Sequence, residues 1–278
     1  MTIARRRILA RVALAGVATL WVALPLVWVL DSSIKPRRDQ YRAAVIPWHD
    51  FEPTPAHWKE HLGHPQLARA LGTSAVVASV STLLCLILGA PAAYGLARFR
   101  FRRWKNENQL LFFLSQRILP PVVTVVPFYL MSRQLGLFDT LWILIAAHTT
   151  FNLPLVVLIL RNGFADIPRE LEEAAAVDGC SPLRIFLTIA LPLSAPALSA
   201  ATVIAFSFSW NEFLFALILT GRDVLTVPRF IQQAAENSWG LQLDAVAVLG
   251  LVAVLPPALL GLAAQRFIVR GLALGALK

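Results

Sequence analysis

Six long apolar runs constrain this chain more than any other feature of its sequence. A helix needs about 20 apolar residues to cross the hydrocarbon core of a bilayer, and each run reaches roughly that length. We therefore expect an all-α, polytopic membrane protein with six transmembrane helices. The expected spans are Ile8–Leu30, Leu71–Ala97, Leu110–Met131, Leu141–Leu160, Leu193–Thr220 and Ala245–Ala264.

The composition excludes the main soluble classes. Hydrophobic residues make up 57% of the 278 residues and charged residues only 15%, whereas soluble proteins carry about 25% charged residues. Disorder needs low hydrophobicity and high charge, and a soluble enzyme needs more charges to coat its surface. A cleavable signal peptide is the alternative interpretation of the first run, but Ile8–Leu30 is longer than a usual signal-peptide core, so we expect a retained helix.

The formal net charge of +9 is unevenly placed along the chain. Lys and Arg concentrate in the N-terminal segment, in the connections after the second and fourth spans, and in the C-terminal tail. Cytoplasmic segments carry such an excess, so the pattern predicts a multi-pass membrane protein with both termini in the cytoplasm. Nucleic-acid binding is not expected, because the chain has neither a basic domain nor an aromatic RNA-binding platform.

Three parts follow from this topology. Residues 1–30 are the N-terminal cytoplasmic segment and first span, residues 31–70 are an extracytoplasmic loop, and residues 71–278 are the core with the other five spans. Histidines cluster in the loop, but their spacing fits no recognised metal-ligand set, so we expect a solvated loop and no metal site. They are His49, His57, His61 and His64. Two cysteines in the core, Cys85 and Cys180, are too few for a disulfide framework.

One cytoplasmic connection, residues 162–192, carries the signals of ordered structure. Pro168 suits a first helical position, and acids follow in the first turns, where they favour a helix N-terminus. Gly179 suits the residue after a helix end, and Ser181 with Pro182 suits the start of a second helix. A short helix, a sharp turn and another helix with small side chains suit docking into a groove on a partner. The acids are Glu170, Glu172 and Glu173.

This connection resembles the EAA loop of importer permeases in the ATP-binding cassette (ABC) superfamily. That pattern, E-A-A-x3-G-x9-I-x-L-P, is matched at every fixed position. The matching residues are Glu173, Ala174, Ala175, Gly179, Ile189, Leu191 and Pro192. Chance agreement over so long a stretch is remote.

Further motifs extend the resemblance over most of the chain, to the carbohydrate-uptake branch and its smaller permease of maltose-type pairs. The motifs are Ser33-Ile34-Lys35-Pro36, Gly136-Leu137-Phe138-Asp139-Thr140, Phe151-Asn152-Leu153-Pro154, Ile167-Pro168-Arg169-Glu170-Leu171, Trp210-Asn211-Glu212-Phe213-Leu214 and Gly271–Lys278. The chain departs from that branch in its tail, where Leu272 replaces the usual Thr and a final Gly is absent. Neither departure touches the EAA-like loop.

The resemblance implies a type I ABC importer permease fold, in which this loop is a cytoplasmic coupling helix docked on an ATPase subunit. It also implies a second permease subunit, two copies of the ABC ATPase, an extracytoplasmic solute-binding protein, and membrane lipid around the spans. The chain itself would be no enzyme and bind no cofactor. ATP and Mg would sit on the ATPase, since this sequence has no G-x4-G-K-[ST] phosphate loop. The implied coupling residues are Glu172, Glu173, Ala174, Ala175, Asp178 and Gly179.

Polar residues inside the apolar runs are candidates for the substrate path, because ionisable groups in a bilayer usually face a cavity or a partner. Asn211 and Glu212 would bond hydroxyl groups, and Trp210 would face a sugar ring. Arg117 would pair with Glu212 or extend to an interface, and Asn152 lies in the fourth run. The alternative is that these groups only bond neighbouring helices.

Two further features of the spans bear on the path. Asn152 and His148 lie four residues apart, hence on one helix face, where helix–helix hydrogen bonding is the favoured interpretation. Prolines are expected to kink the helices, which would suit alternating access. They are Pro120, Pro121, Pro127, Pro154, Pro192, Pro196, Pro256 and Pro257.

The leading hypothesis is a permease subunit that forms half of the translocation pathway for a di- or oligosaccharide. ATP would close the partner ATPases, move the coupling helices together and turn the cavity outward. Glycerol phosphate or another polyol-type solute is the alternative substrate. A self-contained secondary transporter is the alternative class, which the ordered EAA-like loop argues against. An intramembrane enzyme is set aside, because the sequence holds no convincing nucleophile–base pair or metal constellation.

Overall fold

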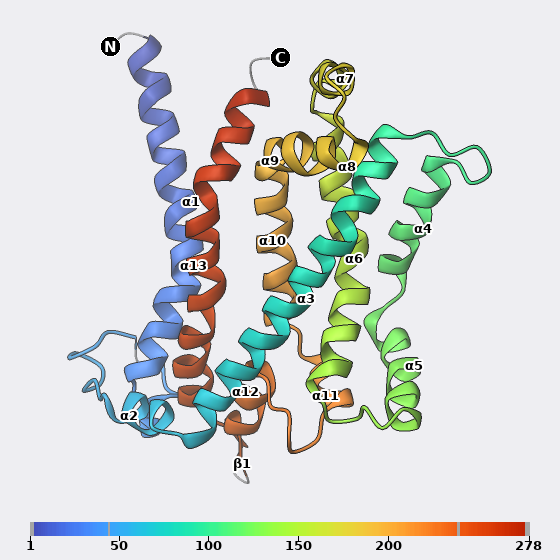
Figure 1. The fold of residues 1–278 in the computed structure, drawn as a ribbon. Helices are drawn as coiled ribbons and strands as arrows, with labels where there is room; N and C mark the ends of the chain where they lie inside the picture. The colour runs from blue at the N-terminus through green and yellow to red at the C-terminus, as the bar shows by residue number, and fades with distance from the viewer. Residues whose placement is uncertain (1–2, 44, 238–239, 276–278) are drawn as a thin grey trace. The chain divides into compact units, whose positions relative to one another are not determined.

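The computed structural model is almost entirely α-helical (Figure 1) and describes residues 3–43, 45–237 and 240–275. The end of the tail motif, residues 276–278, lies outside the described residues. The chain divides into two compact units, each considered by itself: Met1–Leu67 with Phe230–Val254, and Ala68–Arg229 with Leu255–Lys278.

Helices follow one another along the chain, apart from one short antiparallel strand pair. In chain order the elements are α1 (Ile3–Ile34), the 3₁₀ turn η1 (Arg37–Asp39), α2 (Ala56–Leu62), α3 (Pro65–Arg98), α4 (Asn106–Ile118), α5 (Pro121–Gln134), α6 (Leu141–Ala165), α7 (Arg169–Val177), α8 (Pro182–Ile185), the π-helical turn η2 (Phe186–Ala190), α9 (Leu191–Leu193), α10 (Ala195–Trp210), α11 (Leu214–Leu219), α12 (Val227–Ala235), β1 (Glu236–Asn237), β2 (Gly240–Leu241) and α13 (Leu243–Gly275).

Four of the six expected spans are single long helices. α1, α3, α6 and α13 each contain a stretch long and apolar enough to cross a membrane. Their mean hydropathies lie between 2.1 and 2.4. The four runs are thus confirmed, with helix ends displaced by several residues. The described chain holds up to six spans if each of two bent helix pairs counts as one. The pairs are α4 with α5, and residues Pro182–Leu193 with α10, which are bent by 75°.

The third expected span is broken at its prolines. α4 and α5 are bent by 88° from one another. Leu119 adopts an extended conformation, because a residue before proline avoids the helical region. Pro121 then occupies the first turn of α5, where its missing N–H costs nothing. The expected kink at Pro120 and Pro121 is therefore confirmed as a sharp break.

The fifth expected span, Leu193–Thr220, is wrong as one continuous helix. α10 ends at Trp210, and α11 starts again at Leu214. The carboxylate of Glu212 accepts the backbone N–H of Phe215 at 2.9 Å, which supplies the cap of a new helix. Hydropathy alone passes over this break, because the residues on both sides are apolar.

The segment after α1 is more ordered than the expected solvated loop. η1 and α2 form within it, and α3 already starts at Pro65. His57 and His61 are only 5% and 6% exposed, so for these two side chains the expectation of solvation is wrong. Both contact the carboxylate of Asp244, which lies almost 200 residues later in the same unit.

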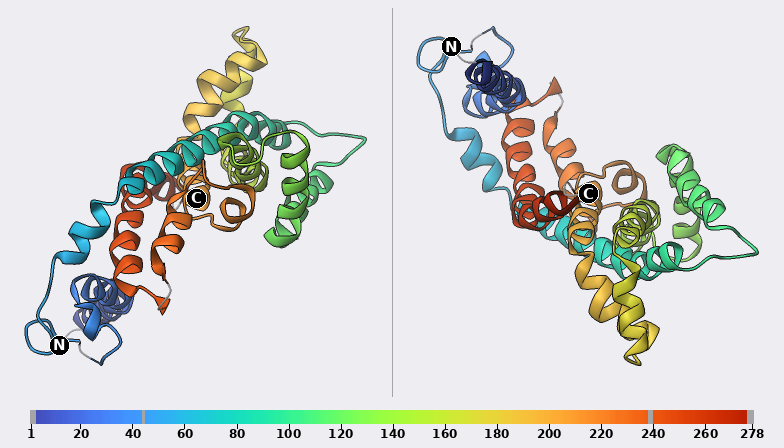
Figure 2. Two further views of the ribbon diagram at one scale, coloured as in Figure 1. Left: turned by 90° about the horizontal axis from the view of Figure 1, so that it is seen from below. Right: turned by 90° about the horizontal axis from the view of Figure 1, so that it is seen from above.

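Helix α6 lies at the centre of the second unit. Its C-terminal half packs with α3, α10 and η2 around Leu160 and Phe164, and its N-terminal half packs with α5 and α11 around Leu144 and Phe215. A Cβ on Gly163 would lie 2.3 Å from that of Ala197, so glycine is required where α6 and α10 approach. α7 and α8, yellow to gold in Figure 2, project away from these packed helices.

Candidate functional site

The projecting loop is built by local capping signals. Gly179 has φ +83°, a left-handed conformation that glycine adopts without strain. Its N–H donates to Ala176 O, and the N–H of Cys180 reaches Ala175 O, both at 3.0 Å. A Cβ at Gly179 would meet nothing within 4 Å, so backbone conformation rather than space demands this glycine.

The second helix of the loop starts as the sequence predicts. Ser181 is the N-cap of α8, and its Oγ accepts the N–H of Arg184 at 3.4 Å, with Pro182 in the first turn. The first helix differs by one residue, because Pro168 is the N-cap of α7 and not its first helical residue.

Most of the predicted coupling residues point outward from α7. Glu173, Ala174, Asp178 and Gly179 are exposed, whereas Ala175 is buried. Apolar side chains accompany the exposed ones: Val177 is 88% exposed and Leu183 is 67% exposed. Apolar side chains displayed at the tip of a polar loop are typical of a docking surface.

Glu172 behaves differently from its neighbours because it points inward. Arg98, the last residue of α3, donates from Nη2 and Nε to Glu172 Oε1 at 2.7 and 2.8 Å. The hydroxyl of Tyr94 donates to Oε2 at 2.7 Å. Both oxygens of this predicted coupling residue are therefore engaged within the chain.

Tyr94 and Arg98 are site residues that the sequence did not reveal. In the sequence Arg98 counts only as a basic residue at the end of a span. Its contact with Glu172 joins positions 74 residues apart, and spacing along one chain carries no signal for such a pair.

The second candidate region is a cavity of about 220 Å³ among α5, α6, α10 and α11. Amide, imidazole and carboxylate groups share its lining with four phenylalanine rings. Its lining residues are Pro121, His148, Phe151, Asn152, Phe208, Asn211, Glu212, Phe213 and Phe215. Three of the five predicted path residues, Asn152, Asn211 and Glu212, thus meet at one cavity.

The other two path residues lie outside the lining. Arg117 donates to Phe151 O at 3.2 Å and stacks on the rings of Phe151 and Phe208. It therefore contacts two of the phenylalanine side chains that line the cavity. Trp210 is 2% exposed and stacks on Phe206. Its ring is therefore turned away from this cavity.

The expected pairing of Arg117 with Glu212 is wrong. Besides capping α11, Glu212 Oε2 lies 3.5 Å from Nε2 of His148. A carboxylate at a helix N-terminus already gains from the helix dipole, which removes the need for an arginine partner.

Asn152 belongs to a helix–helix network, as expected. Its Nδ2 donates to Ser209 Oγ at 3.0 Å, and that hydroxyl lies 3.0 Å from Ser81 Oγ. Its Oδ1 is buried and accepts no hydrogen bond within the described part of the chain. One half of the amide is therefore structural, and the other half is a buried oxygen without a hydrogen-bond donor among the described residues.

A larger cavity of about 450 Å³ lies among α3, α10 and the later part of α13. Its lining is mainly apolar, with three hydroxyl groups from Ser79, Thr82 and Thr202. This cavity was not predictable from the sequence, because hydroxyl residues in transmembrane helices usually bond their own backbone, as Thr202 does here.

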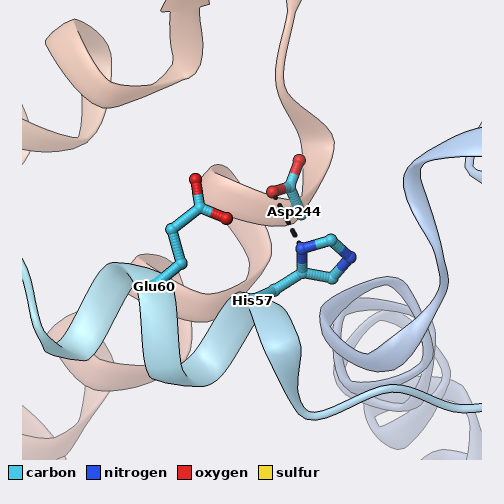
Figure 3. Close-up of side chains that lie close together, drawn as sticks. All are labelled: His57, Glu60 and Asp244. Atoms are coloured by element: carbon cyan, nitrogen blue, oxygen red, sulfur yellow. Dashed lines mark ion pairs between the residues drawn. The ribbon is translucent and has the colours of Figure 1, made fainter.

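In the first unit, His57, Glu60 and Asp244 place possible metal-ligand atoms within 4.8 Å of one another (Figure 3). Arg37, however, donates from Nη2 to both carboxylates at 2.9 Å. These bonds to Asp244 and Glu60 raise the pKa of the guanidinium and outweigh the opposing effect of burial. A cation at these carboxylates would have to compete with Arg37, whose guanidinium already pairs with both of them.

Comparison with known proteins finds similarity to membrane components of transport systems. Residues 85–274 match the family described as "Binding-protein-dependent transport system inner membrane component". The probable ABC transporter permease protein YurM of Bacillus subtilis (strain 168) is 31% identical over 264 residues, which cover 92% of this chain and 84% of that one. The trehalose transport system permease protein SugB of Mycobacterium tuberculosis (strain CDC 1551 / Oshkosh) is 32% identical over 262 residues, 93% of each chain.

The fold is shared with a solved importer. The crystal structure of a bacterial ABC transporter involved in the import of the acidic polysaccharide alginate contains a chain that matches with a TM-score of 0.70. The match has 20% sequence identity and covers 96% of this chain and 98% of that chain. At this identity the likeness concerns the fold alone.

Proposed function

This chain belongs to the family of inner membrane components of binding-protein-dependent transport systems, and we propose that it imports a di- or oligosaccharide with energy received through α7. It is a permease subunit of a sugar-type ABC importer, a transport protein and not an enzyme. The similarity to a trehalose permease over 93% of the chain supports the sugar class. Glycerol phosphate or another polyol-type solute is the alternative cargo.

The observation that carries the coupling role is the outward face of α7. Glu173 and Val177 are exposed on a helix that a left-handed glycine ends and that projects from the packed spans. We assign this face to the cleft of a separate ATPase subunit, which binds ATP and Mg. Closure of the ATPases on ATP would move α7 and turn the cavity outward.

The full importer would hold a second, related permease, two ATPase copies and an extracytoplasmic solute-binding protein. Both termini of this chain would lie in the cytoplasm, on the side of α7. The distribution of Lys and Arg between alternate connections supports this orientation.

The cavity beside Glu212 would form part of the sugar path. A sugar offers hydroxyl groups to amides and carboxylates and apolar ring faces to aromatic side chains. The lining provides both, with the side chains of Asn211 and Glu212 and the ring of Phe208 at one cavity. Arg117 and Trp210 would act on this path only through the residues that they support.

Uptake by the complete importer tests the coupling role. Glu173→Lys reverses the exposed charge, and Gly179→Asp adds a negatively charged side chain at the exposed end of α7, where it would meet the ATPase. Both should abolish substrate uptake while leaving normal amounts of the protein in the membrane. Normal uptake by both variants would refute coupling through α7, and uptake that survives deletion of the ATPase partner would instead support a self-contained transporter.

The path is tested by two substitutions on α6. Asn152→Leu removes the bond to Ser209 and makes the cavity wall apolar at this position, whereas Thr150→Val makes a similar polar-to-apolar change on an exposed face of the same helix. Uptake should fall by about tenfold in Asn152→Leu, the effect of losing a buried hydrogen bond, and stay near normal in Thr150→Val. Equal uptake by the two variants would remove this cavity from the path.

A further inference from the structure

We propose that Arg98 and Tyr94 are positioning residues that transmit the movement of α7 to helix α3 through Glu172. This inference rests on the proposed function, since it needs α7 to receive the movement of an ATPase. In this proposal the adjacent residues Glu172 and Glu173 of α7 have different partners. Glu173 faces outward to the ATPase, and Glu172 faces inward to the transmembrane helix.

The geometry of the contact is that of a rigid link. The side chains of Arg98 and Glu172 are only 8% and 11% exposed, so the pair is screened from water. Charge-assisted bonds in such a place are short and directional. Breaking a buried pair by removing one partner is costly, because the other charge is left without compensation. α7 therefore cannot move away from α3 without losing these bonds.

Arg98 also holds the chain that leads into α7. Its Nη2 donates to the carbonyl of Ile167 at 3.0 Å, two residues before the helix begins. One guanidinium thus contacts both the entry to α7 and the body of α7. A shift of the loop as a whole would pull on the end of α3 at two points.

Tyr94 connects the same link to the helices on either side of the loop. Its ring lies 5.4 Å from that of Phe164 in α6 and 5.0 Å from that of Phe186 in η2. Its hydroxyl meanwhile bonds Glu172. The end of α3 is therefore tied to the segment before α7, to α7 and to the segment after it.

The exposed acids of α7 provide the contrast for a test. Glu170 and Glu173 lie on the same helix and are exposed. Neighbouring positions on a helix point about 100° apart, so single substitutions can separate the inward contact from the outward one.

The test uses the complete importer, reconstituted in proteoliposomes with its ATPase, second permease and loaded binding protein. Glu172→Gln and Arg98→Gln should still co-purify with the ATPase, but substrate taken up per ATP hydrolysed should fall by about tenfold, as expected for one lost charge-assisted bond. Asp166→Asn, the matched loss of one exposed charge just before α7, should keep the normal ratio. The double variant Arg98→Glu with Glu172→Arg should recover uptake relative to either single charge reversal.

The outcomes separate this inference from the coupling role itself. If Glu173→Lys abolishes uptake while Glu172→Gln and Arg98→Gln keep the normal ratio of uptake to ATP, the transmission through Arg98 is refuted and the coupling role stands. A double reversal no better than the single reversals, with all three present in the membrane, also refutes it. If Glu173→Lys has no effect, the coupling role fails first.

Discussion

Three carboxylates, on Glu172, Glu212 and Asp139, each accept several hydrogen bonds at a place where a helix ends or meets another. Glu172 ties α7 to α3, and Glu212 caps α11. Asp139 accepts the backbone N–H groups of residues 222–224 at 2.8 to 3.0 Å. Acids are scarce in this chain, with 16 in 278 residues, and these three satisfy backbone or buried groups that membrane helices would otherwise leave unpaired.

Asp139 fits its position closely. It adopts φ +61°, which aspartate tolerates better than most residues, and its own N–H donates to Leu219 O at the end of α11. A Cβ on Gly221 would lie 2.7 Å from Asp139 Oδ2. The loop after α11 is therefore shaped to receive this carboxylate.

Removal of this carboxylate should lower stability. Asp139→Ala leaves three backbone donors without their acceptor, and we expect a loss of roughly 1–2 kcal/mol of unfolding free energy for a partly exposed group. Asp223→Asn removes a charge from the same loop and keeps its backbone N–H, so its melting temperature should stay near that of the parent. Thermal unfolding of the purified protein in detergent measures both. Equal melting temperatures for Asp139→Ala and the parent would contradict the role.

The same group predicts a dependence on pH. Burial opposes ionisation of Asp139, but hydrogen bonds from the backbone N–H groups outweigh it and lower the pKa of the carboxyl. Its contribution is then fully present above the ordinary pKa of about 3.9 and is lost as the pH falls through the lower folded value. The difference in melting temperature between the parent and Asp139→Asn should be constant from pH 8 to pH 5 and shrink below about pH 4.

At the scale of elements, hydropathy predicts helices well and helix breaks poorly. The runs that became α1, α3, α6 and α13 contain only apolar neighbours at their centres, so length alone identifies them. Two apolar runs are instead interrupted, one at Pro120 and Pro121 and the other around Glu212, between α10 and α11. A helix cap inside an apolar run is a local contact that an average over the run conceals.

The loop around α7 shows the same division. Gly179 and Ser181 act through bonds to residues within four positions, so their roles were predictable from sequence. The partners of Glu172 and Asp244 lie far away along the chain. Only the fold brings these partners together, and no local sequence pattern predicts the contacts.

Asp244 predicts a stability effect for the first unit. Arg37, His57 and His61 all contact its Oδ2, and it is 1% exposed. Asp244→Ala should cost about 3 kcal/mol or more, because buried polar partners lose their acceptor. Glu60→Gln, at the half-exposed end of the same network, should cost no more than about 1 kcal/mol. Denaturant titration of the purified protein compares them, and equal losses would refute the central place of Asp244.

At the scale of the whole molecule, the excess of apolar residues is accounted for by the membrane spans. The positions of the Lys and Arg residues support one orientation of the chain in the membrane. The proposed orientation would place α7 on the cytoplasmic side and the segment after α1 outside. Two native cysteines make this testable with little change to the chain, since Cys85 is fully buried and Cys180 lies partly exposed at the turn after α7.

Labelling with a membrane-impermeant maleimide should separate the two faces. In intact cells stripped of their outer barriers, Val45→Cys, at a side chain that is 63% exposed, should react, whereas Cys180 should react only after the membrane is opened. Reaction of Cys180 in sealed cells would reverse the orientation and remove α7 from the side where ATP is available.

Cross-linking from α7 to the ATPase tests the central claim most directly. A photoactivatable thiol reagent on Val177→Cys, in a Cys180→Ser background, would place the probe on the most exposed apolar residue of the helix. In membranes that contain the complete importer, we predict an adduct with the ATPase subunit whose yield changes when ATP is added, and no such adduct from Val45→Cys. Absence of any adduct from position 177 in a complex that still transports would contradict the account.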